Sequence, residues 1–148
     1  MMFLFMSLIL SVGFAESQEW PDISTPIADI GIDGSKDSAL IIAIERYSFI
    51  QPVKGALKNG DDWEGYFETS MKIPDSRVHY LYNEQATRAD IEMKASELSK
   101  NTPAGGRIWL VYIGHGADYK GEPIILDVDT RQRESSFRSQ LRQADLLK

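Results

Sequence analysis

Short apolar runs recur along the chain and predict the strands of a sheet. Residues 38–44 and 108–113 form continuous, mainly apolar runs that are rich in β-branched residues. Runs of this length and kind are typical of strands buried on both faces of a parallel sheet. Residues 77–82 alternate in polarity, which predicts a further strand, and we expect a short strand over 123–128.

The spacing of apolar residues between these strands predicts helices. Asp61, with Glu64 three residues later, is expected as the N-cap of the first helix. The apolar face of this helix repeats at i, i+3 and i+4, with Trp63, Tyr66 and Phe67. Thr87, followed by Asp90, is expected as the N-cap of a second helix, which ends at 103–106. Alternating strands and helices predict right-handed crossovers and a mostly parallel sheet, and therefore an α/β fold.

The amino terminus has the pattern of a targeting segment. Residues 1–14 contain eleven apolar side chains, a run shorter than the roughly 20 residues that span a bilayer. Small residues at Gly13 and Ala15 precede a polar stretch, which predicts a secretory signal peptide over 1–15, cleaved after Ala15. The mature protein is then expected to be secreted or periplasmic. Residues 16–37 are predicted to be an extended lead-in to a single domain over 38–148.

Composition narrows the possible functions. The net charge of −6 argues against capture of nucleic acid or of an anionic membrane surface. We therefore expect neither as a partner once the signal peptide is removed. The absence of cysteine excludes disulfides, thiolate metal sites and a cysteine nucleophile within these 148 residues.

A histidine between two glycines is the main candidate for chemistry. Gly114, His115 and Gly116 follow the run at 108–113 directly, and open α/β sheets collect their chemistry beyond the carboxyl ends of the strands. A histidine there can exchange protons with a nucleophile near neutral pH. The Gly116 N–H can stabilise a developing oxyanion. A structural histidine in a turn is an equally open interpretation of these three residues.

The segment Tyr-Ile-Gly-His-Gly-Ala at 112–117 resembles the catalytic-histidine motif of the caspase and metacaspase superfamily of cysteine peptidases. The segments at 39–47, 55–68 and 83–98 are similar to the first strand, the first helix and the second crossover of that fold. The resemblance covers 38–148 and is greatest to secreted bacterial caspase-like proteins. It implies a caspase-haemoglobinase-like, three-layer αβα fold and a cysteine-type endopeptidase acting on polypeptides. His115 would be the dyad histidine and Gly116 an oxyanion donor.

One part of the family pattern is missing. In the family, the nucleophilic cysteine follows the next buried strand, in an Asp-x-Cys segment, and this sequence has no cysteine. We therefore expect 38–148 to be the N-terminal part of the catalytic domain, incomplete at its C-terminus and inactive by itself.

Two other interpretations are open. One is a non-catalytic, secreted caspase-like module that binds or regulates other proteins. The other is an unrelated α/β hydrolase or nucleotide-binding domain, against which stands the absence of the glycine-rich and Gly-x-Ser-x-Gly motifs of those folds.

Other polar residues have weaker claims to function. Asp127 and Asp129 could bind calcium or a basic substrate side chain, or could be solvated loop carboxylates, and no other metal or cofactor is expected. His79 is expected to have a surface or cross-strand role. Arg46 is expected in a structural ion pair. Ser48 is a conceivable replacement nucleophile that no pattern places beside His115. Two tryptophans are expected in the core: Trp63 and Trp109.

Overall fold

The computed structural model describes residues 23–27, 30–131, 141–142 and 145. The predicted signal peptide with its cleavage site at Ala15, and part of the lead-in at 16–37, lie outside these residues. Within the described residues, the chain alternates strands and helices up to residue 113 and then forms short strands, so the predicted α/β class is confirmed.

A parallel sheet forms the centre of the molecule. It contains β1 (Ser38–Ala43), β2 (Val78–Tyr82) and β3 (Ile108–Ile113), in the order β2-β1-β3 among the described residues. β1 is parallel to both neighbours, with Ala43 beside Tyr82 on one side and Ile113 on the other. The three carboxyl ends therefore meet at one edge of the sheet.

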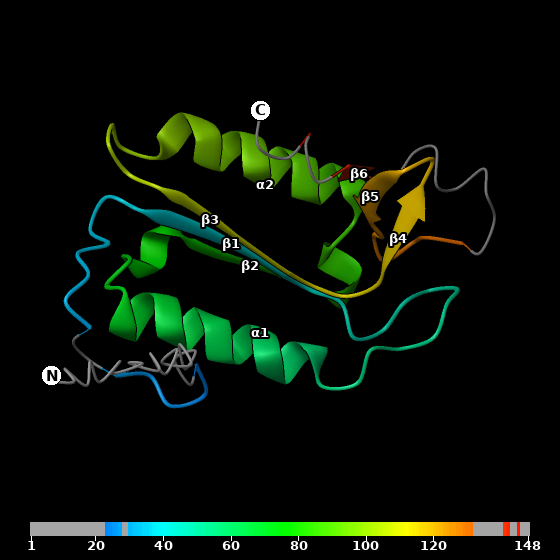
Figure 1. Ribbon diagram of the computed structural model, residues 1–148, viewed down its shortest axis with the longest axis horizontal. Helices are drawn as coiled ribbons and strands as arrows, with labels where there is room; N and C mark the ends of the chain where they lie inside the picture. Colours follow the sequence, from blue (N-terminus) through cyan, green and yellow to red (C-terminus); the bar gives the residue numbers. More distant parts are fainter. Residues whose placement is uncertain (1–22, 28–29, 132–140, 143–144, 146–148) are drawn as a thin grey trace, which may run out of the picture.

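The helices cover the two faces of this sheet. α1 (Ala56–Gly65), continued by the π-helical turn η1 (Tyr66–Ser70), lies on one face, and α2 (Arg88–Asn101) lies on the other (Figure 1). Alternate residues of β1 supply both cores because successive strand side chains point to opposite faces. Leu40 and Ile42 belong to the core cluster that contains Ile91 and Leu98 of α2. Ala39 and Ile41 belong to a second cluster, which contains Phe67 of η1.

The structure corrects the predicted start of the first helix. α1 begins at Ala56, five residues before the expected N-cap Asp61, and its N-cap is Gly55, in the left-handed conformation at φ 82°. The Glu45 carboxylate accepts hydrogen bonds from the Gly55 and Leu57 N–H groups at 3.0 and 3.4 Å. The Glu45 carboxylate thus supplies the hydrogen-bond acceptor that an N-cap side chain usually provides.

The predicted start of the second helix is confirmed. The Thr87 hydroxyl accepts a hydrogen bond from the Asp90 N–H at 3.2 Å. It also donates to the Asp90 carboxylate at 2.6 Å.

β3 is less buried than its sequence predicts. It is an edge strand among the described residues, since it pairs with β1 alone, and Ile108 is 43% exposed. The apolar run at 108–113 therefore predicted the strand correctly but did not predict its position at the edge of the sheet. Trp63 and Trp109 are only partly buried, although both pack against the core cluster around Phe67.

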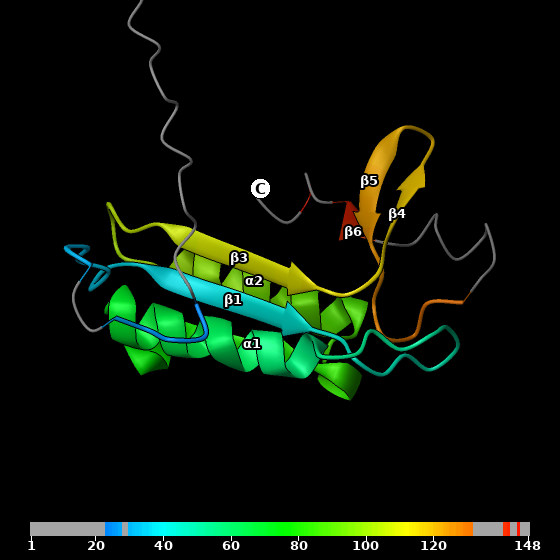
Figure 2. The ribbon, with the colours of Figure 1, turned by 60° about the horizontal axis from the view of Figure 1, so that its bottom comes forward.

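A small antiparallel sheet follows the histidine loop. It consists of β4 (Gly116–Tyr119), β5 (Glu122–Ile125) and β6 (Leu141–Arg142), and Figure 2 shows its first two strands standing beside the carboxyl end of β3. β5 confirms the first part of the strand expected at 123–128. β4 was not among the strands predicted from the sequence, because its pairing depends on the two-residue turn at Lys120 and Gly121, both with positive φ.

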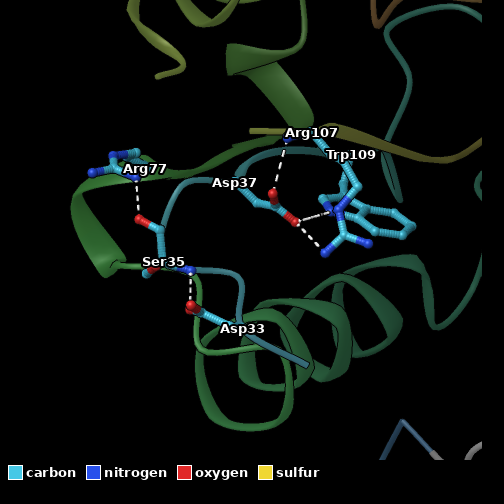
Figure 3. A network of polar contacts seen from close by, with 6 residues as sticks. All are labelled: Asp33, Ser35, Asp37, Arg77, Arg107 and Trp109. Carbon is cyan, nitrogen blue, oxygen red and sulfur yellow. Dashed lines mark hydrogen bonds and ion pairs between the residues drawn. The ribbon is translucent and has the colours of Figure 1, made fainter. Parts of the chain in front are cut away.

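The opposite end of the central sheet is tied together by one buried carboxylate. Asp37, which precedes β1, is 3% exposed. It accepts hydrogen bonds from the Arg107 N–H at 2.9 Å, the Arg107 Nε at 2.8 Å and the Trp109 Nε1 at 3.0 Å (Figure 3). Nearby, the Asp33 carboxylate accepts from the Ser35 N–H, and Arg77 donates to the Ser35 carbonyl. The network joins the starts of β1 and β3.

Candidate active site

His115 lies at the carboxyl edge of the parallel sheet, in the short connection between β3 and β4. The segment after β1 faces it. The His115 Nε2 is 2.8 Å from the Gln51 carbonyl oxygen, and its ring centroid is 5.0 Å from that of Tyr47. The fold therefore brings together segments more than 60 residues apart, because β1 and β3 are adjacent and parallel.

The contact with Gln51 defines the tautomer of the imidazole. A carbonyl oxygen only accepts hydrogen bonds, so the ring must donate from Nε2. In a neutral histidine the other nitrogen, Nδ1, then holds the lone pair that can take a proton. A neutral histidine held in this way can act as a general base through Nδ1.

Two tyrosine hydroxyls hold the backbone of His115. Tyr47 accepts a hydrogen bond from the His115 N–H at 2.7 Å. Tyr112 donates toward the carbonyls of His115 at 2.6 Å and Leu126 at 2.8 Å, and its hydroxyl is 3.2 Å from that of Tyr47. Burial raises the pKa of both tyrosines above the usual value, so both hydroxyls keep their protons at neutral pH.

The Gly116 N–H is directed away from the β4–β5 ladder. The Leu126 N–H donates to the His115 carbonyl at 3.0 Å. This bond marks Gly116 and Ile125 as a pair of the antiparallel ladder that exchanges no hydrogen bonds with each other. The Gly116 N–H thus points outward from the strand that starts beside His115.

A small cavity of about 290 Å³ lies next to these groups. Its lining includes Gln51, His115 and Gly116, with apolar surface from Ile50 and Leu126. Arg131 is the one charged residue in the described lining, and its guanidinium lies over the Phe49 ring, 4.1 Å from the centroid. No motif in the sequence singles out Arg131. A larger cavity of about 700 Å³ lies between α2 and the start of β3, away from His115.

The other polar candidates each have a hydrogen-bond or ion-pair partner. Ser48 donates to Asp129 at 3.0 Å, so the structure pairs it with a carboxylate rather than with His115. Asp127 is buried and accepts from the Thr130 hydroxyl at 2.9 Å. Arg46 forms the expected ion pair, with Glu84 at 3.6 Å, but both side chains are largely exposed. Such exposed pairs stabilise a fold little.

His79 lies on β2, far along the sheet from the carboxyl-edge connection that carries His115. It is partly buried. Burial, together with the charge of Lys94, lowers its pKa. The charges that act on His79 belong to α2, and the surface or cross-strand role stays a prediction.

Among the described residues, no three histidines or carboxylates gather in a way that could hold a metal ion. The possible calcium ligands Asp127 and Asp129 each bind a hydroxyl. No helix within the described ranges is both long and apolar enough to cross a bilayer.

Comparison with models of protein families and with curated proteins gives no match for this chain, so the resemblance at 112–117 stays a prediction.

Proposed function

We propose that the chain forms the histidine-bearing part of a caspase-like cysteine endopeptidase domain, with His115 as the base of a Cys–His dyad. The observation that carries the proposal is the hydrogen bond between His115 Nε2 and the Gln51 carbonyl. It leaves Nδ1 as the proton acceptor at the carboxyl edge of a parallel sheet, beside a cavity that Gly116 also lines. The opposite placement of α1 and α2 supports the finer assignment to a three-layer, caspase-haemoglobinase-like fold.

The proposed reaction is peptide-bond hydrolysis in two steps. A cysteine thiol from outside these 148 residues transfers its proton to Nδ1, and its sulfur attacks the peptide carbonyl carbon. The Gly116 N–H stabilises the oxyanion that forms. His115 gives the proton to the departing amine as the C–N bond breaks and a thioester remains. It then takes a proton from water as the water oxygen bonds to the thioester carbon. The C–S bond breaks, the peptide leaves as a carboxylic acid, and the proton on His115 returns to the sulfur to restore the thiol.

The proposed location of this reaction is outside the cytoplasm. The support comes from the apolar segment at 1–14 with small residues before the proposed cleavage site at Ala15. Polypeptides would be the substrates.

The test begins by sequencing the template past codon 148. The proposal expects a further apolar strand followed by Asp-x-Cys. The protein encoded by the whole frame is then assayed with a peptide library, and cleavage should be blocked by iodoacetamide. His115→Ala should lower kcat/KM by at least about 100-fold, whereas His79→Ala, the matched control, should retain it.

Three results would contradict the proposal. The first is a reading frame without a cysteine. The second is cleavage that survives His115→Ala in the whole protein. The third is His115-dependent cleavage by the 148-residue chain alone, because that chain has no cysteine and its nucleophile would then be of another kind.

The lack of cysteine in these residues favours one second candidate, a non-catalytic caspase-like module that binds a polypeptide. The two candidates separate in the same experiment. A frame that ends without a cysteine, together with peptide binding that does not depend on His115, would select the binding module.

A further inference from the structure

We infer that Tyr47 is a positioning residue for His115, and that its hydroxyl keeps the imidazole in the orientation that donates from Nε2 to the Gln51 carbonyl. The inference rests on the proposed function for its meaning in catalysis. The hydrogen bonds that support it involve no nucleophile and can be tested without one.

One short segment after β1 holds His115 from two sides. Tyr47 accepts the His115 N–H at 2.7 Å, and its ring packs on the imidazole at a centroid distance of 5.0 Å. Four residues later, the Gln51 carbonyl takes the Nε2 proton at 2.8 Å. The backbone and the ring of His115 are therefore fixed to the same segment, and the two contacts support each other.

The hydroxyl protons in this network have defined directions. Both carbonyl oxygens that Tyr112 contacts can only accept hydrogen bonds. Tyr112 is therefore the donor in both contacts, and the two oxygens share its single hydroxyl proton. In the 3.2 Å contact between the hydroxyls, Tyr47 must then be the donor. Tyr47 thus donates to Tyr112 while it accepts the His115 N–H. The two hydroxyls hold the N–H and the carbonyl of one residue.

Gly114 makes room for this pair of hydroxyls. A Cβ added at Gly114 would overlap the hydroxyl oxygens of both Tyr47 and Tyr112. The glycine before the histidine therefore allows the hydroxyls to approach the peptide that they bind. Neither hydroxyl could hold its place beside a larger residue.

Removing the Tyr47 oxygen has a specific expected effect. Tyr47→Phe keeps the ring on the imidazole but leaves the His115 N–H without its acceptor. The peptide is then free to turn, and the Nε2 contact with Gln51 weakens. We expect the ratio of the Nε2–H to the Nδ1–H tautomer to fall by up to about tenfold, the size expected for the loss of one hydrogen bond.

The experiment is nitrogen NMR of the two histidine rings in ¹⁵N-histidine-labelled protein above the histidine pKa range. Long-range ¹H–¹⁵N spectra distinguish the two tautomers of each ring. His79 is the internal reference because it is the only other histidine in the sequence. Tyr80→Phe is the matched control, since it removes a hydroxyl that donates to the Leu57 carbonyl at 3.0 Å without touching His115.

The expected result is a His115 that is Nε2–H in the unmodified protein and in Tyr80→Phe, and shifted toward Nδ1–H in Tyr47→Phe alone. The inference is overturned if the unmodified protein shows Nδ1–H at His115, a result that needs no variant to fold. It is equally overturned if Tyr47→Phe and Tyr80→Phe give the same tautomer ratio. Neither outcome uses peptidase activity, so the peptidase proposal fails or stands separately.

Discussion

At the scale of single residues, the two glycines beside His115 differ in how much space a side chain would have. A Cβ at Gly114 would overlap two bound tyrosine hydroxyls, whereas a Cβ at Gly116 would meet the Ile124 carbonyl oxygen at 3.4 Å. We expect Gly114→Ala to lower the free energy of unfolding by about 1–3 kcal/mol, the usual cost of overpacking. Gly116→Ala is expected to cost less than about 1 kcal/mol. Urea titration of both variants measures the difference.

Comparing the stabilities of the two glycine variants also tests how rigidly the two tyrosine hydroxyls are held. If Gly114→Ala is as stable as Gly116→Ala, the hydroxyls can move aside and the tyrosine network is not rigid. Tyr47→Phe combined with Gly114→Ala tests the cause, because removing one of the overlapping oxygens should recover part of the lost stability.

Part of this candidate site could be predicted from the sequence, and the rest could not. His115 and Gly116 stand directly after an apolar run, and local order alone places them at the sheet edge. Gln51 contacts His115 through its backbone carbonyl. Because every residue has such a carbonyl, the residue type at position 51 gives no sign of this contact. The hydroxyl of Tyr47 reaches His115 across 68 positions of the chain, and only the paired β1 and β3 bring the two together.

At the scale of elements, the start of α1 depends on a distant carboxylate. Glu45 accepts hydrogen bonds from the first N–H groups of the helix, next to the left-handed Gly55. We expect Glu45→Ala to lower the free energy of unfolding by about 0.5–2 kcal/mol, as for the loss of an N-cap. Glu45→Gln retains an acceptor oxygen and should cost less, since it loses only the charge. Thermal and urea unfolding of the pair distinguish these effects.

A result in which both Glu45 variants match the unmodified protein would show that Gly55 alone is enough to start the helix. The same helix shows what periodicity can and cannot predict. Local spacing correctly predicted that Trp63, Tyr66 and Phe67 face the core, although the last two lie in η1. The carboxylate that caps α1 lies ten residues before Gly55 in the sequence. Thr87, by contrast, caps α2 from within the local sequence, and its prediction was correct.

At the scale of the whole molecule, the apolar runs predicted the parallel sheet and its helices, because those patterns follow directly from burial. They did not predict that β3 is an edge among the described residues, since an apolar strand looks the same wherever it pairs. Strand β4 was missed for the opposite reason. Its four residues form no apolar run, although exposed and partly buried positions alternate along them, and pairing with β5 across the turn at Lys120 defines the strand.

The two ends of the central sheet differ in their polar contacts. His115 lies at the carboxyl ends of the strands, and Asp37 links the starts of β1 and β3 at the opposite end. Burial alone would raise the pKa of Asp37, but the hydrogen bonds from Trp109 and from the backbone and side chain of Arg107 outweigh it and lower the pKa. A depressed folded-state pKa gives stability that is fully present above the unfolded-state value. It is lost as the pH falls through the folded-state value.

Asp37→Asn is therefore expected to destabilise the protein in a pH-dependent way. At pH 7 it removes the charge that three donors of Arg107 and Trp109 share, at a cost of about 1.5–3 kcal/mol. As the pH falls through and below about 4, where aspartate becomes protonated, the difference from the unmodified protein should shrink. Urea unfolding at pH 7, 5 and 3 measures it, with the exposed Asp75→Asn as control. A difference that stays constant down to pH 3 would show that Asp37 holds β1 and β3 through shape and neutral hydrogen bonds rather than through its charge.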